Sequence, residues 1–268
     1  MSASWFLISN DDGIDAPGLN ALCDAVAGLA EVRVVAPAGA RSATGHSVSS
    51  SGRPIPAHVS ATLDGRAGWA VDGTPADCVR LGLGPLADGR ARPAWVLSGI
   101  NAGANLGIDT YYSGTVAAAR EALLHGCRAV AVSQYLSTDL TVEWDRVSRL
   151  ARQILEWLFA VVRDPAPSLW NVNLPALAAG ERPKGLRIVP MDLLPVDTRL
   201  DEESTAAAPG RRVFEFAGIY HTRRAAAGGD VEALFAGYVT VTPLGLDKTD
   251  VRWLQALSTR ALPDLGGA

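Results

Sequence analysis

Short, unbroken apolar runs alternate with helix-like segments through the first 165 residues of this chain. A strand that is apolar without interruption is buried on both faces, which is typical of parallel sheets covered by helices on each side. Thr74 followed by Pro75 provides a start signal for one of the helices. The pattern predicts an α/β protein with a Rossmann-like, doubly wound and mostly parallel sheet. The expected strands span residues 5–8, 32–36, 94–98 and 129–133, and the expected helices span 17–29, 75–86, 115–125 and 143–162.

The second half of the chain has a different pattern. Six prolines between residues 165 and 195 interrupt it, and residues 195–212 are predicted to form an exposed arm. We therefore expect residues 1–165 to form the α/β core and residues 166–268 to form an α+β extension of one integrated domain. The extension is expected to contain strands at 169–173, 186–189, 213–216 and 238–242 and a helix at 250–260.

Composition excludes several classes of protein. The 268 residues are 48% hydrophobic, which is enough for a large core, and the net charge is −4. Because no run of Lys or Arg exists, we expect no extended nucleic-acid binding. No apolar run reaches ~18 residues and no secretion leader is visible, so a cytoplasmic location without membrane attachment is expected. Cys23, Cys78 and Cys127 lie far apart in apolar contexts, which predicts buried free thiols.

Two adjacent carboxylates, Asp11 and Asp12, directly follow the first predicted strand. Neighbouring carboxylates repel each other and are costly to remove from water, so a cation is expected beside them. No His or Cys is close in sequence, and oxygen donors of this kind favour Mg²⁺ or Mn²⁺. The alternative is a solvated turn without a ligand.

A second polar motif spans residues 98–122 and also follows a predicted strand. In open α/β sheets ligands bind beyond the carboxyl ends of the strands, so residues 10–13, 37–47 and 99–115 are expected to converge there. Ser113, Gly114 and Thr115 directly precede a predicted helix, whose first amides can bind a phosphate. Helix capping by the two hydroxyls is the structural alternative, and it uses the same geometry.

Together these motifs resemble those of the SurE family, the metal-dependent 5′/3′-nucleotidases also called survival protein E. The resemblance extends from residue 5 to about residue 250, with further matching stretches at residues 36–37, 41–42, 45–47, 73–79, 171–175 and 237–244. It implies one divalent ion per subunit, held by Asp11, Asp12, Ser42 and Asn101. It also implies a homodimer or homotetramer in which the second half embraces another subunit.

The expected activity is hydrolysis of nucleoside 5′-monophosphates, and of 3′-monophosphates as a further possibility, to nucleoside and phosphate. Asp11 and Asp12 are the expected catalytic residues, with attack by water favoured over an aspartyl-phosphate because the Asp-x-Asp arrangement is absent. Two alternatives stay open: a phosphatase for another small phosphomonoester, and a non-catalytic nucleotide-binding regulatory module.

Three further polar residues are assigned to phosphate or substrate binding. Asn105 and Asp109 can orient phosphate or water, or simply hold their loop together. His46 lies in the second polar loop, where it can reach a substrate or remain a surface residue. The chain departs from the family at residues 38–40, which are Ala-Gly-Ala where polar residues are common, so substrate preference is left open. Tyr111, Tyr112 and Tyr220 are expected in the core or at an interface rather than beneath a base.

Overall fold

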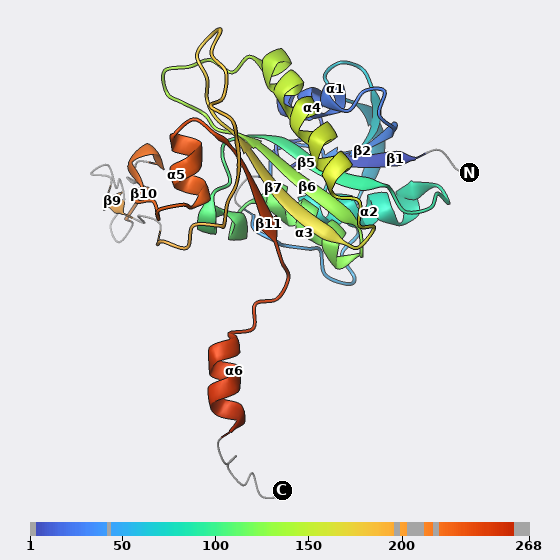
Figure 1. Cartoon of the computed structure of the whole chain (residues 1–268). Helices are drawn as coiled ribbons and strands as arrows, with labels where there is room; N and C mark the ends of the chain where they lie inside the picture. The colour runs from blue at the N-terminus through green and yellow to red at the C-terminus, as the bar shows by residue number, and fades with distance from the viewer. Residues whose placement is uncertain (1–3, 42–43, 196–198, 203–211, 217–219, 260–268) are drawn as a thin grey trace, which may run out of the picture.

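The protein is built on one nine-stranded sheet that is mostly parallel, as the sequence predicts (Figure 1). The computed structural model describes residues 4–41, 44–195, 199–202, 212–216 and 220–259. The strand order is β3-β4-β2-β1-β5-β6-β7-β11-β8, and all neighbours from β4 to β7 run parallel. The parallel strands are β4 (Ala67–Val71), β2 (Glu31–Pro37), β1 (Trp5–Ser9), β5 (Trp95–Ala102), β6 (Arg128–Gln134) and β7 (Ser168–Leu174).

Helices cover both faces of the sheet. Alternate residues of β1 enter different cores: Phe6 and Ile8 belong to one cluster with Leu22, and Leu7 belongs to the other with Val79. The first cluster is covered by α1 (Pro17–Ala25) and α4 (Trp144–Val161), and the second by α2 (Pro75–Leu83) and α3 (Gly114–Leu124). The prediction of a doubly wound sheet is therefore confirmed.

The predicted start of α2 is also confirmed. Thr74 accepts a hydrogen bond from the Asp77 amide at 3.1 Å, and the Asp77 carboxylate accepts one from the Thr74 amide at 3.0 Å. Pro75 occupies the first turn, where its missing amide hydrogen costs nothing. Helix α1 ends at Ala25, four residues before the predicted end, because Gly28 adopts a positive φ in the turn that follows.

One edge of the sheet is an antiparallel hairpin that was not predicted. It consists of β3 (Ala57–Ala61) and β4, which are joined by a turn at residues 62–66. Three of the five residues of β3 are exposed and β4 contains Gly68, so neither strand carries a continuous apolar run. Helix α5 (Asp230–Phe235) was missed as well, because six residues are too few for a clear helical period.

The second half contributes to the same sheet as the first. Strand β11 (Val239–Leu244) pairs antiparallel with β7 and parallel with β8 (Leu186–Ile188). A separate two-stranded ribbon pairs β9 (Leu200–Glu202) with β10 (Phe214–Phe216). The described part of the predicted arm is exposed. Residues 196–198 and 203–211 of the arm lie outside the described residues.

The last helix, α6 (Val251–Ser258), stands clear of the rest of the molecule (Figure 1). Its side chains Val251, Trp253 and Leu254 are all more than half exposed. All three cysteines are buried and free, as expected. Within the described residues, no helix has both the length and the apolar character needed to cross a membrane.

Candidate active site at the carboxyl edge of the sheet

The Asp11–Asp12 pair lies where β1 ends, at the carboxyl edge of the sheet. The side chain of Asn10 closes the turn by donating to the Gly13 carbonyl at 2.8 Å. The loop after β2 crosses directly above, because the Arg41 amide donates to the Asp11 carbonyl at 2.7 Å. Two of the three predicted polar loops therefore meet here. The next residue, Ser42, was predicted as a metal ligand and lies outside the described residues.

Asp11 points into the start of α3. The Thr115 hydroxyl donates a hydrogen bond to the Asp11 carboxylate, which is only 5% exposed. A Cβ atom on Gly114 would lie 2.8 Å from both the Cβ and Oδ2 atoms of Asp11, so only glycine allows this approach. The pKa of Asp11 is raised to about 6, mainly by burial and in part by the negative charge of the neighbouring Asp12. This carboxylate is therefore costly to ionise without a cation.

The end of β5 brings Asn101 to the same edge. The pairing of β5 with β6 is interrupted between Ser98 and Asn101, so the strand end is re-aimed. Gly99 permits this path: its φ is +131°, and a Cβ there would lie 2.2 Å from the Val132 carbonyl oxygen. The interruption therefore depends on a glycine in the middle of the motif.

The hydrogen bonds of Asp12 and Asn101 leave one side-chain oxygen of each residue available as an acceptor. The Ala102 amide donates to one carboxylate oxygen of Asp12 at 3.1 Å, and burial raises the pKa of Asp12. The Asn101 side-chain amide donates to the Gly103 carbonyl at 2.6 Å, which leaves its oxygen as an acceptor. Asp11, Asp12 and Asn101 are thus gathered by hydrogen bonds between chain segments about 90 residues apart.

The Ser113–Thr115 turn is the N-terminus of α3. The Ser113 hydroxyl accepts a hydrogen bond from the Val116 amide at 3.0 Å, so Ser113 caps the helix. Thr115 is fully buried, and its hydroxyl donates its hydrogen bond to the Asp11 carboxylate. The capping alternative for Ser113 is therefore observed. The phosphate-binding role of these residues stays a prediction.

Asn105 and Asp109 both hold their loop in place. The Asn105 side chain donates to the Ser133 hydroxyl at 2.8 Å. The backbone carbonyl of Asn105 accepts hydrogen bonds from the side chains of Asn171 and Asn173. Asp109 accepts from the Tyr220 hydroxyl at 2.7 Å and forms an ion pair of 2.6 Å with Arg223.

His46 is tied to α3 instead of being a solvated surface residue. Its Nε2 atom lies 2.7 Å from Glu121, whose side chain is 2% exposed and also contacts Arg80 at 2.6 Å and His125 at 3.0 Å. Although burial raises the pKa of Glu121, its contacts with His46 and Arg80 lower it to about 2. Neither Glu121 nor Arg80 was predicted, because a lone carboxylate in an alanine-rich helix gives no local signal in the sequence.

Tyr111 and Tyr112 precede the same helix and are exposed, at 43% and 64%. The expectation that they are core residues is therefore wrong for this chain on its own, and a place at an interface stays a prediction. Tyr220 is half-buried and bonded to Asp109. Its hydroxyl donates to the partly buried Asp109 carboxylate at 2.7 Å.

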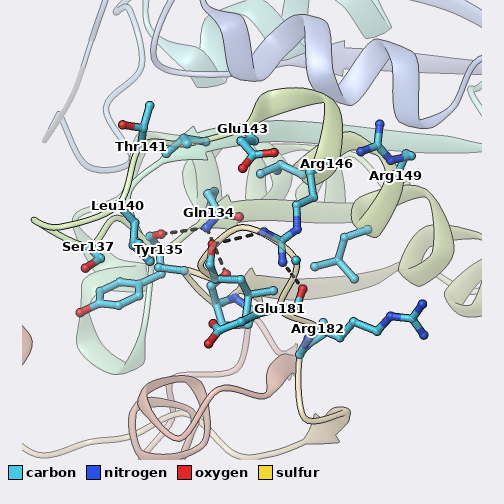
Figure 2. A pocket seen from close by; sticks show the side chains of 18 of the residues that line it. Gln134, Tyr135, Ser137, Leu140, Thr141, Glu143, Arg146, Arg149, Glu181 and Arg182 are labelled. Carbon is cyan, nitrogen blue, oxygen red and sulfur yellow. Dashed lines mark hydrogen bonds between the residues drawn. The ribbon is translucent and has the colours of Figure 1, made fainter.

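The protein also has two cavities, and none of the described residues that were predicted to bind metal, phosphate or substrate lines either of them. The larger, about 670 Å³, lies between the first turns of α4 and residues 175–183 (Figure 2). Figure 2 shows Arg146 reaching across to this loop, where it contacts the carbonyl of Glu181 and donates to that of Ala178 at 2.6 Å. The smaller, about 330 Å³, begins at Gly103, next to the Asn101 side chain.

Comparisons with known proteins identify the family. The model of the family described as survival protein SurE matches residues 6–193. The chain is 39% identical over 259 residues to the 5′-nucleotidase SurE of Desulforudis audaxviator, covering 94% of this chain and 95% of the relative. It is also 39% identical to the 5′-nucleotidase SurE of Moorella thermoacetica over 260 residues, with 94% of each chain covered.

A solved structure agrees with these relatives. The crystal structure of the SurE protein from Aquifex aeolicus superposes with a TM-score of 0.79 at 32% identity, covering 95% of this chain and 98% of that one. The fold, the order of the motifs and the length of the match all coincide. This chain therefore belongs to the survival protein SurE family.

Proposed function

We propose that this protein is a 5′-nucleotidase that hydrolyses nucleoside 5′-monophosphates to nucleoside and phosphate with the help of a divalent metal ion. The observation that carries the proposal is the meeting of Asp11, Asp12 and Asn101 with the N-terminus of α3 at one sheet edge. The names of the similar SurE proteins support the same activity. A 3′-nucleotidase activity is a further part of the proposal.

The residues of the site fit a divalent ion. Asp11 is buried beside Asp12, and no Lys or Arg side chain is paired with either carboxylate among the described ion pairs. Within the described residues no group of three or more His, Cys, Asp or Glu side chains is arranged to hold a metal ion, so the ligands would be mainly Asp and Asn oxygens. Such oxygen donors suit Mg²⁺ or Mn²⁺ better than softer metals. Asp11, Asp12, Asn101 and Ser42 would hold the ion.

The chemistry follows from the placement of these side chains. When bound, a divalent ion supplies positive charge against the phosphoryl oxygens. Helix α3 begins at the same edge, and the Gly114 amide in its first turn can bind another phosphate oxygen. Asp12 is only partly buried, so it can accept the proton of an attacking water molecule. Attack by water is proposed over direct attack by a carboxylate, because the Asp-x-Asp arrangement of aspartyl-phosphate enzymes is absent.

A panel of phosphate esters tests the proposal. Phosphate release from nucleoside 5′- and 3′-monophosphates, and from p-nitrophenyl phosphate, is measured with Mg²⁺ or Mn²⁺ and again with excess EDTA. We expect release from nucleotides that EDTA abolishes and added metal restores. Release from p-nitrophenyl phosphate alone would indicate another small phosphomonoester, and release from none would support a binding module.

The protein is also proposed to form a homodimer or homotetramer. Helix α6 exposes Val251, Trp253 and Leu254 while standing clear of the sheet (Figure 1). An amphipathic helix of eight residues that stands apart from the other described elements is not stable alone in water. Its apolar residues support packing against another subunit.

A further inference from the structure

The smaller cavity adjoins the proposed metal site through a single residue. Gly103 lines the cavity and accepts the hydrogen bond from the side chain of Asn101. Its neighbour Ala102 donates to Asp12. A molecule whose phosphate lies over Asp12 and Asn101 therefore has this cavity directly beside it. At about 330 Å³ the cavity is at the lower end of the ~300–1,000 Å³ typical of small-molecule sites.

The lining of the cavity is aromatic and lacks fixed charges. Its side chains include Tyr135, Tyr220 and His221, with the Ser137 and Thr138 hydroxyls at the loop that follows β6. Among the residues that the structure describes, the lining of the cavity contains no Asp, Glu, Lys or Arg. A phosphate would find no counter-charge here, whereas a flat, neutral ring would find stacking surfaces and hydroxyl partners. The cavity is therefore suited to the uncharged part of a phosphate ester.

The aromatic walls are held in position before any ligand arrives. The Tyr135 ring packs against Phe235, with 5.3 Å between ring centroids, and its hydroxyl contacts the Nδ1 atom of His221. The Tyr220 hydroxyl is bonded to Asp109, which is itself paired with Arg223. Phe235 and Arg223 do not line the cavity, so they support its walls from outside. Preorganised aromatic walls lower the entropy cost of binding a ring.

We propose that this cavity binds the nucleoside part of the substrate, with the base stacked on Tyr135 and its edge facing Ser137 and His221. The inference rests on the proposed nucleotidase activity and adds the residues that select a nucleotide over a phosphate ester without a base. Asp109 is then a positioning residue, because it fixes Tyr220 through a hydrogen bond and is not among the residues that line the cavity.

The test compares two esters that share a 5′-phosphate, AMP and ribose 5-phosphate, in metal-loaded enzyme. In Tyr135→Ala the ratio of their kcat/KM values is expected to fall roughly 10- to 100-fold, the effect of losing one stacking ring. Tyr135→Phe keeps the ring and should keep the ratio within about threefold. Tyr238→Ala is the matched control, because its ring packs on Arg187 outside the cavity.

A second variant and a second readout keep the inference testable. If Tyr135→Ala does not fold, Ser137→Trp fills the cavity from the loop and should lower the same ratio. Adenosine binding, measured by calorimetry, is expected for the wild type and should be lost in both variants. Equal loss of both esters in a folded variant, or a wild type that does not bind adenosine, would overturn the inference. Absence of phosphate release from every nucleotide would overturn the proposed function alone, since adenosine binding still tests the cavity.

Discussion

Replacing Gly114 by alanine tests how closely α3 must approach the proposed catalytic carboxylate. The added Cβ would lie 2.8 Å from Asp11 Cβ and Oδ2, where ordinary contacts begin near 3.4 Å, so the groups must separate by about 0.6 Å. The φ of Gly114 is not in the left-handed region, so crowding is the only obstacle. The helix start is fixed by the Ser113 cap, and Asp11 is therefore expected to move.

The expected cost falls on catalysis more than on stability. Displacement of a reacting group by about 1 Å lowers rates by about 10²-fold, which corresponds to ~2.7 kcal/mol in the barrier. Overpacking of a core lowers the free energy of unfolding by about 1–3 kcal/mol, whereas replacing a helix glycine by alanine raises it by up to ~1 kcal/mol. We expect kcat/KM for AMP to fall on the order of 10²-fold while the melting temperature falls by less than about 8 °C.

Gly82→Ala is the matched control for this prediction. A Cβ at Gly82 would lie 2.7 Å from Leu7 Cδ1, which is just as crowded but is the flexible end of a side chain in the core. Its activity should stay within about threefold of the wild type, because nothing at the site has to move. Phosphate release and thermal melting are measured on both variants. A folded Gly114→Ala enzyme with near-normal turnover would refute the reasoning.

Three further predictions address the metal, the Glu121 cluster and assembly. Asp11→Asn or Asp12→Asn should remove most metal-dependent turnover without unfolding the protein, since each removes half of the anionic charge of the pair. Near-normal turnover in either variant would contradict the metal assignment. The lowered pKa of Glu121, from 4.5 to about 2, corresponds to about 3 kcal/mol favouring its ionised form in the folded state. This contribution is complete above about pH 4.5 and is lost as the pH falls toward 2, so urea unfolding should show a stability gap between wild type and Glu121→Gln that narrows over this interval. A stability difference between wild type and Glu121→Gln that does not change with pH would argue against this contribution of Glu121. Deleting residues 250–268 should reduce the oligomer size measured by light scattering more than it reduces turnover. A wild-type protein that is monomeric at micromolar concentration would contradict the assembly proposal.

The sequence determined the layered sheet and the edge on which the site lies. Continuous apolar strands such as β1 and β6 can only be buried on both faces, and this property is local to each strand. Polar residues that directly follow parallel strands must emerge at one edge, whatever the order of the strands. The sequence alone therefore predicts that Asp11, Asp12 and Asn101 lie on a common edge of the sheet. The local capping pattern of Thr74 was equally readable.

Only the tertiary structure decided which of these groups touch. The strand order β2-β1-β5 brings α3 against Asp11, and the contacts of Asp11 with Thr115 and of His46 with Glu121 join residues 104 and 75 positions apart. The aromatic cavity similarly joins Tyr135 to His221 across 86 positions. Such pairs leave no periodic trace in the sequence, because each depends on how whole elements pack and not on the neighbours of either residue.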